Sequence, residues 1–198
     1  MKALWLALLL VLAGCGNTPQ LGKLPTDAVV LAFGDSLTFG TGASPEESYP
    51  AVLEKLIGRH VESAGVPGEV SAEGLQRLPD VLNEIKPKLL LLCHGGNDLL
   101  RKTGEAQTAA NLRSMVSLAK SKGIEVVLIA VPKPGLLLSS PDYYEKIAVE
   151  FKLPIEADVL RSIVSTPDLK SDTVHPNAAG YKKMADAIAA LLKQAKAI

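Results

Sequence analysis

Three short runs of consecutive apolar residues constrain the fold of this 198-residue chain more than any other feature. Val29–Phe33, Leu89–Cys93 and Val126–Val131 consist of apolar residues throughout. Strands buried on both faces require such runs, whereas a strand with one solvated face alternates apolar and polar residues. Longer segments with helical periodicity lie between and after these runs, at residues 49–59, 71–85, 105–122 and 178–196. This alternation predicts an α/β fold in which helices cover both faces of a mainly parallel sheet.

Two weaker segments complete the predicted sheet. Val61–Ser63 is a short second strand, and a fifth strand is expected near Leu153–Ala157. The predicted architecture therefore has three α/β/α layers and about five strands. No internal repeat or second domain is visible, so residues 28–198 are expected to form a single domain with a substantial core.

The N-terminus has the pattern of an export signal. Lys2 is followed by the unbroken apolar run Ala3–Val11 and then by Leu12–Cys15. The run is shorter than the roughly 20 apolar residues that a membrane-spanning helix needs, and it is typical of the hydrophobic region of a secretory signal. Small residues directly before a cysteine resemble the lipobox of bacterial lipoproteins. An ordinary signal peptide with an incidental cysteine is the alternative.

The lipobox resemblance predicts a membrane-anchored, exported protein. Residues 1–14 would be the signal peptide, Cys15 the lipidated residue, and residues 15–27 a lipidated N-terminus and tether. Gly16 in place of aspartate resembles lipoproteins that are sent to an outer membrane, provided that the source has one. With Cys15 acylated, Cys93 is the only other cysteine, and its apolar neighbours indicate a small buried hydrophobic residue.

Composition argues against two classes of partner. The chain has 21 basic and 21 acidic residues, so no excess of positive charge is available to bind nucleic acid. Its three histidines lack companion cysteines or paired carboxylates at metal-ligand spacing. We therefore expect neither nucleic acid nor a metal ion as a partner. A monomer without a cofactor is also expected.

Residues suited to catalysis cluster where the predicted strands end. In parallel α/β sheets, ligands bind beyond the carboxyl ends of the strands. The segments at those ends contain most of the chemically suggestive residues, and they are Gly34–Ser36, Ala64–Gly68, His94–Asp98 and Pro132–Leu138.

Ser36 follows the first strand directly. A serine at a strand-to-helix turn can expose its hydroxyl and offer a backbone N–H to an anion. A Gly-Asp-Ser triplet alone often marks only a turn. Asp35 is interpreted as a carboxylate that accepts hydrogen bonds from neighbouring backbone N–H groups.

Asp172 and His175 lie just before the last predicted helix. Histidine can deprotonate a serine, and an aspartate that binds the other ring nitrogen fixes the tautomer. A single turn can bring the two side chains together, although an exposed loop pair is the ordinary interpretation of this spacing. His60 is expected at the surface, and His94 is expected to support the loop that follows it.

Two glycine-containing loops could supply hydrogen-bond donors. Gly95–Asp98 follows a predicted strand, and Asn97 offers a neutral amide to a developing oxyanion. Ala64–Gly68 is a second flexible loop at which a backbone N–H can point to the same place. Each loop taken alone is equally compatible with a plain turn.

Together, these four separated segments resemble, in order, the four blocks of the SGNH hydrolase superfamily. They are Gly-Asp-Ser-Leu at 34–37, the loop ending at Gly68, Gly-Gly-Asn-Asp at 95–98, and Asp172 to Asn177. Residues 68–101 are similar to the bacterial thioesterase I/lysophospholipase L1/arylesterase branch. The resemblance spans about residues 29–192 and implies a flavodoxin-like SGNH hydrolase fold.

The resemblance also implies roles for individual residues. Ser36 would be the nucleophile, with His175 as general base and acid and Asp172 orienting it. The backbone N–H groups of Ser36 and Gly68 and the side chain of Asn97 would form the oxyanion hole. Many relatives carry an asparagine shortly before the glycine of the second block, where this chain reads Glu-Ser-Ala-Gly at 62–65. Gly65 is therefore an alternative to Gly68.

The predicted activity is hydrolysis of carboxylic esters through an acyl-enzyme on Ser36. Substrates would be small-molecule or lipid esters with short- to medium-chain acyl or aryl groups, with thioesters and lysophospholipids included. The expected acyl pocket is lined by Leu99, Leu100, Val131 and Pro132. The leucines at 136–138 either line an acyl channel or belong to the core, and both interpretations stand at this point.

Two other functions are compatible with the same motifs. The protein could be an O-acetylesterase of envelope polysaccharide, which would need a shallow and polar site. It could also be a surface lipoprotein whose fold has become a non-catalytic binding module. The presence of every acid, base and oxyanion residue argues against the second alternative.

Overall fold

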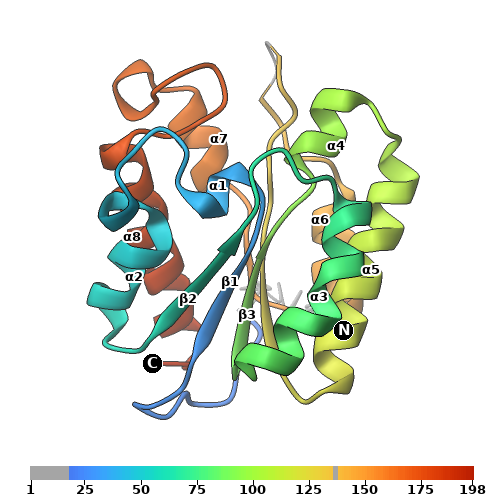
Figure 1. The fold of residues 1–198 in the computed structure, drawn as a ribbon, viewed down its shortest axis with the longest axis vertical. Helices are drawn as coiled ribbons and strands as arrows, with labels where there is room; N and C mark the ends of the chain where they lie inside the picture. The colour runs from blue at the N-terminus through green and yellow to red at the C-terminus, as the bar shows by residue number, and fades with distance from the viewer. Residues whose placement is uncertain (1–17, 136–137) are drawn as a thin grey trace, which may run out of the picture.

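The computed structural model describes residues 18–135 and 138–198. The predicted signal peptide, the lipidation site at Cys15, Leu136 and Leu137 lie outside the described residues. Figure 1 shows a sheet between two groups of helices, so the predicted three-layer α/β/α architecture is confirmed. Among the described residues, no helix is long and apolar enough to span a bilayer.

The sheet has five parallel strands in the order β2-β1-β3-β4-β5. Their bounds are β1 Val30–Gly34, β2 Val61–Gly65, β3 Leu89–Cys93, β4 Glu125–Ile129 and β5 Ile155–Glu156. Every residue of β1 and β3 is buried, because both strands lie inside the sheet and are covered on both faces. The five predicted strands are confirmed, with shifts of one or two residues at their ends.

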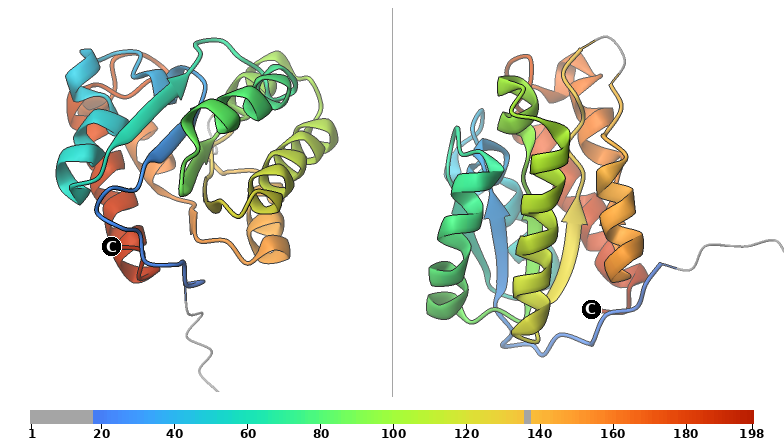
Figure 2. Two further views of the ribbon diagram at one scale, coloured as in Figure 1. Left: turned by 60° about the horizontal axis from the view of Figure 1, so that its bottom comes forward. Right: turned by 90° about the vertical axis from the view of Figure 1, so that its right-hand side faces the viewer.

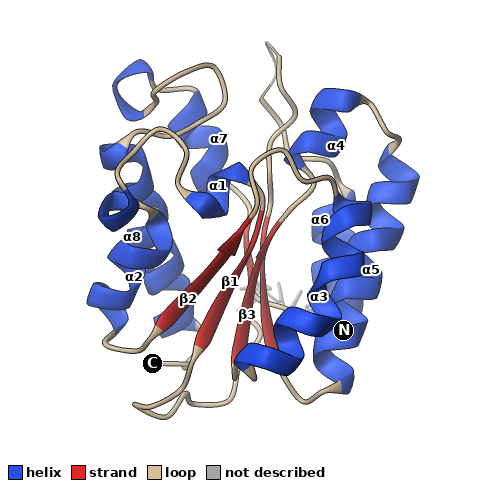
Figure 3. Cartoon of the chain, in the orientation of Figure 1, coloured by secondary structure: helices blue, strands red, loops and turns tan. Residues whose placement is uncertain are grey.

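The register of the sheet aligns the strand ends that matter for function. Gly34, the last residue of β1, is opposite Gly65 of β2 and Cys93 of β3. The loops after these three strands therefore start at the same edge of the sheet. This alignment brings together segments that are far apart in the sequence (Figure 3).

The helices form the two outer layers (Figures 1 and 3). One side of the sheet carries α1 (Ser36–Phe39), α2 (Tyr49–Ile57), α7 (Val159–Val164) and α8 (Ala178–Gln194). The other side carries α3 (Ser71–Ile85), α4 (Gly96–Arg101), α5 (Glu105–Ser121) and α6 (Tyr143–Phe151). Two short 3₁₀ helices are η1 (Pro45–Glu47) and η2 (Pro167–Leu169).

The four long helices predicted from periodicity correspond to α2, α3, α5 and α8. The first ends at Ile57, two residues before its predicted end, because Gly58 adopts the left-handed conformation with φ 61°. The other four helices were not predicted. Of these, α1, α4 and α7 have only four to six residues, too few to establish a helical pattern of apolar side chains, and α6 has nine.

The N-terminal segment differs from the predicted tether. The N–H of Leu21 donates to the carbonyl of Ala195 at 2.9 Å, and that of Leu24 donates to Ala197 at 2.8 Å. Leu24 is also buried. Half of the predicted tether is therefore part of the fold, because its backbone pairs with the C-terminal segment. This contact lies at the amino ends of the strands, opposite the loops that follow β1, β2 and β3 (Figure 2).

Candidate active site

Ser36 is the first residue of α1 and lies directly beyond the buried end of β1. Gly34 permits this turn, since a Cβ atom there would collide with the backbone carbonyl of Cys93. Asp35 caps the helix, and its Oδ1 accepts the N–H of Leu37 at 3.0 Å, as the sequence interpretation expected. The half-buried Ser36 is thus fixed by rigid elements on both sides.

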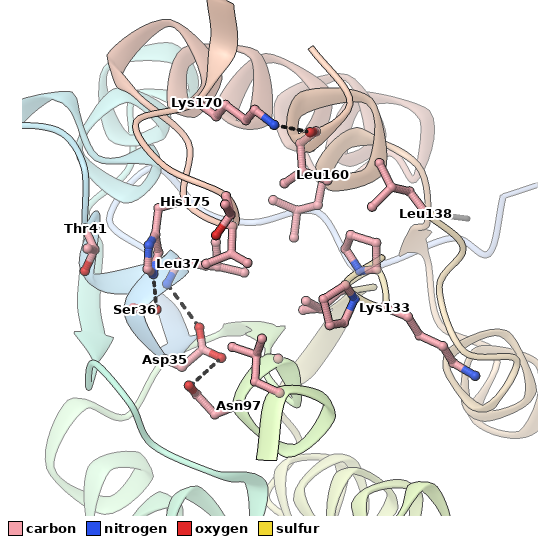
Figure 4. A pocket seen from close by; sticks show the side chains of 18 of the residues that line it. Asp35, Ser36, Leu37, Thr41, Asn97, Lys133, Leu138, Leu160, Lys170 and His175 are labelled. Atoms are coloured by element: carbon pink, nitrogen blue, oxygen red, sulfur yellow. Dashed lines mark hydrogen bonds between the residues drawn. The ribbon is translucent and has the colours of Figure 1, made fainter. Parts of the chain in front are cut away.

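Ser36, His175 and Asp172 form one continuous hydrogen-bonded series. Ser36 Oγ lies 2.9 Å from His175 Nε2 (Figure 4), and His175 Nδ1 lies 2.7 Å from Asp172 Oδ2. An ionised carboxylate only accepts hydrogen bonds, so Nδ1 carries the proton and Nε2 is free to accept from the serine hydroxyl. The arrangement can remove a proton from Ser36.

Local turn chemistry holds Asp172 in place. Its Oδ1 accepts the N–H groups of Val174 and His175, both at 2.8 Å. Partial burial raises the pKa of Asp172, but the hydrogen bonds from the His175 ring and from these two N–H groups outweigh burial and hold the pKa at about 2. Asp172 is therefore ionised at neutral pH.

The loop that carries His175 is closed on itself. The N–H of Ser171 donates to the carbonyl of His175 at 2.9 Å, and Lys170 pairs with Pro176 in an antiparallel bridge. Asn177 then caps α8, since its Oδ1 accepts the N–H of Gly180 at 3.0 Å. The motif folds this way because each polar residue satisfies a nearby backbone group.

Three possible donors to an oxyanion lie at or near Ser36, and they are the backbone N–H groups of Ser36 and Gly68 and the side-chain amide of Asn97. Among the described residues, the N–H groups of Ser36 and Gly68 have no hydrogen-bond acceptor. Both residues and Asn97 line the same cavity. Gly65 is not in the wall of this cavity, and a Cβ atom at this position would collide with the backbone of Phe39. The structure thus brings Gly68, and not the alternative Gly65, to the candidate site.

Asn97 lies in the first turn of α4, with its amide directed toward Asp35 (Figure 4). Nδ2 donates to Asp35 Oδ2 at 3.3 Å and to the backbone carbonyl of Glu69 at 3.0 Å. Burial raises the pKa of Asp35 despite the opposing effects of His94 and the Leu37 N–H. Through its two carboxylate oxygens, Asp35 joins the turn at Ser36 to Asn97. Sequence reasoning did not anticipate the Asp35–Asn97 contact.

The cavity beside Ser36 has a volume of about 770 Å³. Of the predicted pocket residues, Leu100, Val131 and Pro132 line it, and so does Leu138. Leu99 does not line it. Asn97 and Leu100 are three residues apart and share one face of α4, so Leu99 points elsewhere.

Sequence reasoning missed the far wall of this cavity. Leu160 and Val164 of α7 line it, together with Val174 of the histidine loop. Figure 4 shows Leu160 and Leu138 beyond the Ser36–His175 pair. The apolar side chains at Leu160 and Val164 were a possible signal, but α7 is too short to be predicted as a helix.

The remaining histidines and cysteine lie as the sequence indicated. His60 is exposed, while His94 and Cys93 are fully buried. His94 Nδ1 accepts the N–H of Gly95 at 3.0 Å and so supports the loop that leads to Asn97. Within residues 18–135 and 138–198, no group of three or more histidine, cysteine, aspartate or glutamate side chains is arranged to hold a metal ion.

Comparison with known proteins now identifies the family. The model of the GDSL-like lipase/acylhydrolase family matches residues 32–183, which carry all four predicted blocks. The chain belongs to this family. As a GDSL-like acylhydrolase it is 29% identical to the esterase TesA of Pseudomonas aeruginosa, over 93% of this chain and 97% of that protein.

Other relatives of this GDSL-like acylhydrolase have related names. It is 30% identical to thioesterase 1/protease 1/lysophospholipase L1 of Escherichia coli, over 83% of each chain. It is 29% identical to an arylesterase of Vibrio mimicus, over 81% of this chain and 86% of that one. The predicted superfamily resemblance is thereby confirmed.

Solved structures show the same fold. The crystal structure of TesA matches with a TM-score of 0.75 and 29% identity, covering 84% of this chain and 99% of that chain. AlinE4, an SGNH-hydrolase family esterase, matches with a TM-score of 0.66 and 31% identity, covering 89% and 98%. The flavodoxin-like SGNH hydrolase fold predicted from the sequence is confirmed.

Proposed function

We propose that this chain is a serine esterase that cleaves carboxylic esters through an acyl-enzyme on Ser36. The observation that carries the proposal is the 2.9 Å contact between Ser36 Oγ and His175 Nε2, continued at 2.7 Å to Asp172. A serine placed in this way can become a nucleophile at neutral pH. Membership of the acylhydrolase family and the names of the relatives support the same reaction class.

The proposed reaction has two halves. In the first, His175 Nε2 takes the proton of Ser36 as Oγ bonds to the ester carbonyl carbon, and the carbonyl electron pair moves onto oxygen. The N–H groups of Ser36 and Gly68 and the amide of Asn97 stabilise that oxyanion. The tetrahedral intermediate then expels the alcohol, which leaves with the proton from His175. Water attacks the acyl-enzyme by the same steps and releases the acid.

The cavity favours a substrate with an apolar acyl or aryl group. Its walls beyond Ser36 are mostly hydrophobic, with Val131, Leu138 and Leu160 among them. A volume of about 770 Å³ exceeds what an acetyl group needs. A polysaccharide O-acetylesterase would instead be expected to have a shallow polar site, and a pure binding module would not need an intact hydrogen-bonded triad. The names of the relatives support extending the substrate range to aryl esters, thioesters and lysophospholipids.

Hydrolysis of p-nitrophenyl esters of increasing chain length tests this proposal. We expect kcat/KM to rise from acetate to octanoate, because the longer chain fills the apolar cavity. The Ser36→Ala variant, which should keep the fold, is the control for background hydrolysis. Turnover of acetate alone would favour the O-acetylesterase, and the absence of any turnover would favour the binding module.

We also propose that the protein is exported and anchored to a membrane through a lipid on Cys15. The lipobox-like sequence before Cys15 supports this proposal. Cys15 precedes the fixed residue Leu21 by six positions, an extended distance of at most about 22 Å. Because Leu21 lies at the end of the fold opposite the cavity, the active site would face away from the anchoring membrane.

A further inference from the structure

Glu69, the residue after Gly68, is a buried carboxylate to which the proposed reaction assigns no role. Its side chain accepts two hydrogen bonds from Arg77, through Nε and Nη2, both at 2.8 Å. It also lies 3.1 Å from His94 Nε2. Because His94 Nδ1 already accepts the N–H of Gly95, Nε2 carries the proton and donates to Glu69. Three donors therefore converge on one carboxylate that is only 6% exposed.

The electrostatics of Glu69 match this geometry. Burial raises the pKa of Glu69, but the hydrogen bonds from Arg77 and His94 outweigh burial and lower the pKa to about 2. The carboxylate is therefore ionised at neutral pH and is balanced by the Arg77 guanidinium at 2.8 Å. A forked contact between arginine and a carboxylate restrains the position of both groups.

The surroundings of Glu69 tie several elements to this ion pair. The Arg77 guanidinium lies 4.2 Å from the centre of the Phe33 ring of β1 and donates to the carbonyl of Ala64 in β2. Gly74 of α3 lets that helix approach, since a Cβ atom there would collide with His94 Nε2. The side chain of Glu69 is thus fixed relative to the ends of β1, β2 and β3.

The backbone of Glu69 contacts two of the three proposed oxyanion donors. Gly68 is its covalent neighbour, and the Glu69 carbonyl accepts a hydrogen bond from Asn97 Nδ2 at 3.0 Å. The Glu69 N–H donates to the carbonyl of Val66 at 3.1 Å, which closes the turn that holds Gly68. Fixing the Glu69 side chain therefore also fixes the Gly68 N–H and limits rotation of the Asn97 amide.

We propose that Glu69 is a positioning residue of the oxyanion hole, with Arg77 and His94 acting through it. The proposal rests on the esterase function proposed above. In this proposal, the buried Glu69–Arg77 ion pair supports the loop that ends at Gly68. Many relatives carry an asparagine shortly before that glycine, and this chain does not. A displaced donor stabilises the transition state less, because its hydrogen bond matters most when charge develops on the substrate carbonyl. Disturbing Glu69 should therefore lower kcat and leave KM nearly unchanged.

The first test compares Glu69→Gln with a matched control, Glu54→Gln. Glutamine keeps the size of the side chain but directs an amide N–H₂ group toward the donors of Arg77 and His94. Glu54 also accepts from a histidine and from a backbone N–H, at the opposite end of β2 and away from the cavity. We expect Glu69→Gln to lower kcat about 10- to 100-fold with KM within about twofold, and Glu54→Gln to change neither.

A double variant with Asn97→Ala separates positioning from a general loss of stability. If Glu69 acts through Asn97, the two losses of kcat share one cause and fall short of multiplying. Losses that multiply fully, an unchanged kcat in folded Glu69→Gln, or an effect on KM alone would each overturn the proposal. Thermal unfolding measured by circular dichroism establishes that each variant is folded.

Arg77→Lys is the alternative test if Glu69→Gln does not fold. Lysine keeps the positive charge but loses the forked contact, so we expect a loss of kcat about 3- to 10-fold with KM unchanged. Wild-type kcat in a folded Arg77→Lys protein would then overturn the positioning role. A wild-type protein that hydrolyses no ester would instead overturn the proposed function on which this inference rests.

Discussion

At the scale of single residues, the proposed site assigns different roles to Asp172 and Asn97: Asp172 orients the base, and Asn97 stabilises the oxyanion. Asp172 accepts hydrogen bonds from the His175 ring and from the Val174 and His175 N–H groups, whereas Asn97 lines the cavity beside Ser36, where charge would develop on the substrate. The low pKa of Asp172, about 2, means that this carboxylate stays ionised across the working range of an esterase. A loss of activity within that range is therefore not caused by protonation of Asp172.

Substitutions at these two positions should give different kinetics. Asp172→Asn should lower kcat by roughly 10³- to 10⁴-fold, because an amide can donate to Nδ1 and favour the wrong tautomer of His175. Asn97→Ala should lower kcat by roughly 10²- to 10³-fold, since it removes only a transition-state donor. Its KM and the pH dependence of its kcat should match those of the wild type. Steady-state kinetics against pH on one short-chain aryl ester measure both. A changed pH dependence of kcat in Asn97→Ala would exclude the oxyanion role. Asn83→Ala, at an exposed position, is the control.

At the scale of elements, α7 forms the far wall of the cavity. Val164 is half-buried and lines this wall, so Val164→Phe should narrow the cavity without filling the core. We expect kcat/KM for the octanoate ester to fall about tenfold while that for acetate changes less than about threefold. Val149→Phe on the exposed face of α6 controls for added surface hydrophobicity. Equal losses on both esters would show that the acyl chain does not reach α7.

Elements also show what the sequence could predict. The consecutive apolar residues of β1 and β3 and the long periodic patterns of α3 and α8 depend on local rules, and those elements were predicted within one or two residues. The Ser36–His175 pairing was available only through the resemblance, since 139 residues separate the two in sequence. The role of Glu69 had no local signal, because the Arg77 and His94 donors meet it only after α3 packs against β3.

At the scale of the whole molecule, the two functional ends are opposite each other. The cavity lies beyond the carboxyl ends of the strands, and the N-terminal segment leaves from the amino ends. Cys15→Ser should therefore abolish acylation and membrane partition while leaving kcat unchanged, because the described N-terminal segment pairs with the C-terminal segment at the amino ends of the strands and not with the Ser36 loop. Stable anchoring should require more than one acyl chain, since a single chain binds only marginally. Unmodified, freely soluble wild-type protein from the native host would contradict the anchor.

The central claim is that Ser36 is the nucleophile, and covalent trapping tests it most directly. The folded protein is incubated with a fluorophosphonate, and the modified peptide is identified by mass spectrometry. We expect one adduct per chain, on Ser36, together with complete loss of ester hydrolysis. Ser36→Ala should fold, take up no label and hydrolyse no ester. Labelling at another residue, or undiminished hydrolysis by Ser36→Ala, would contradict the account.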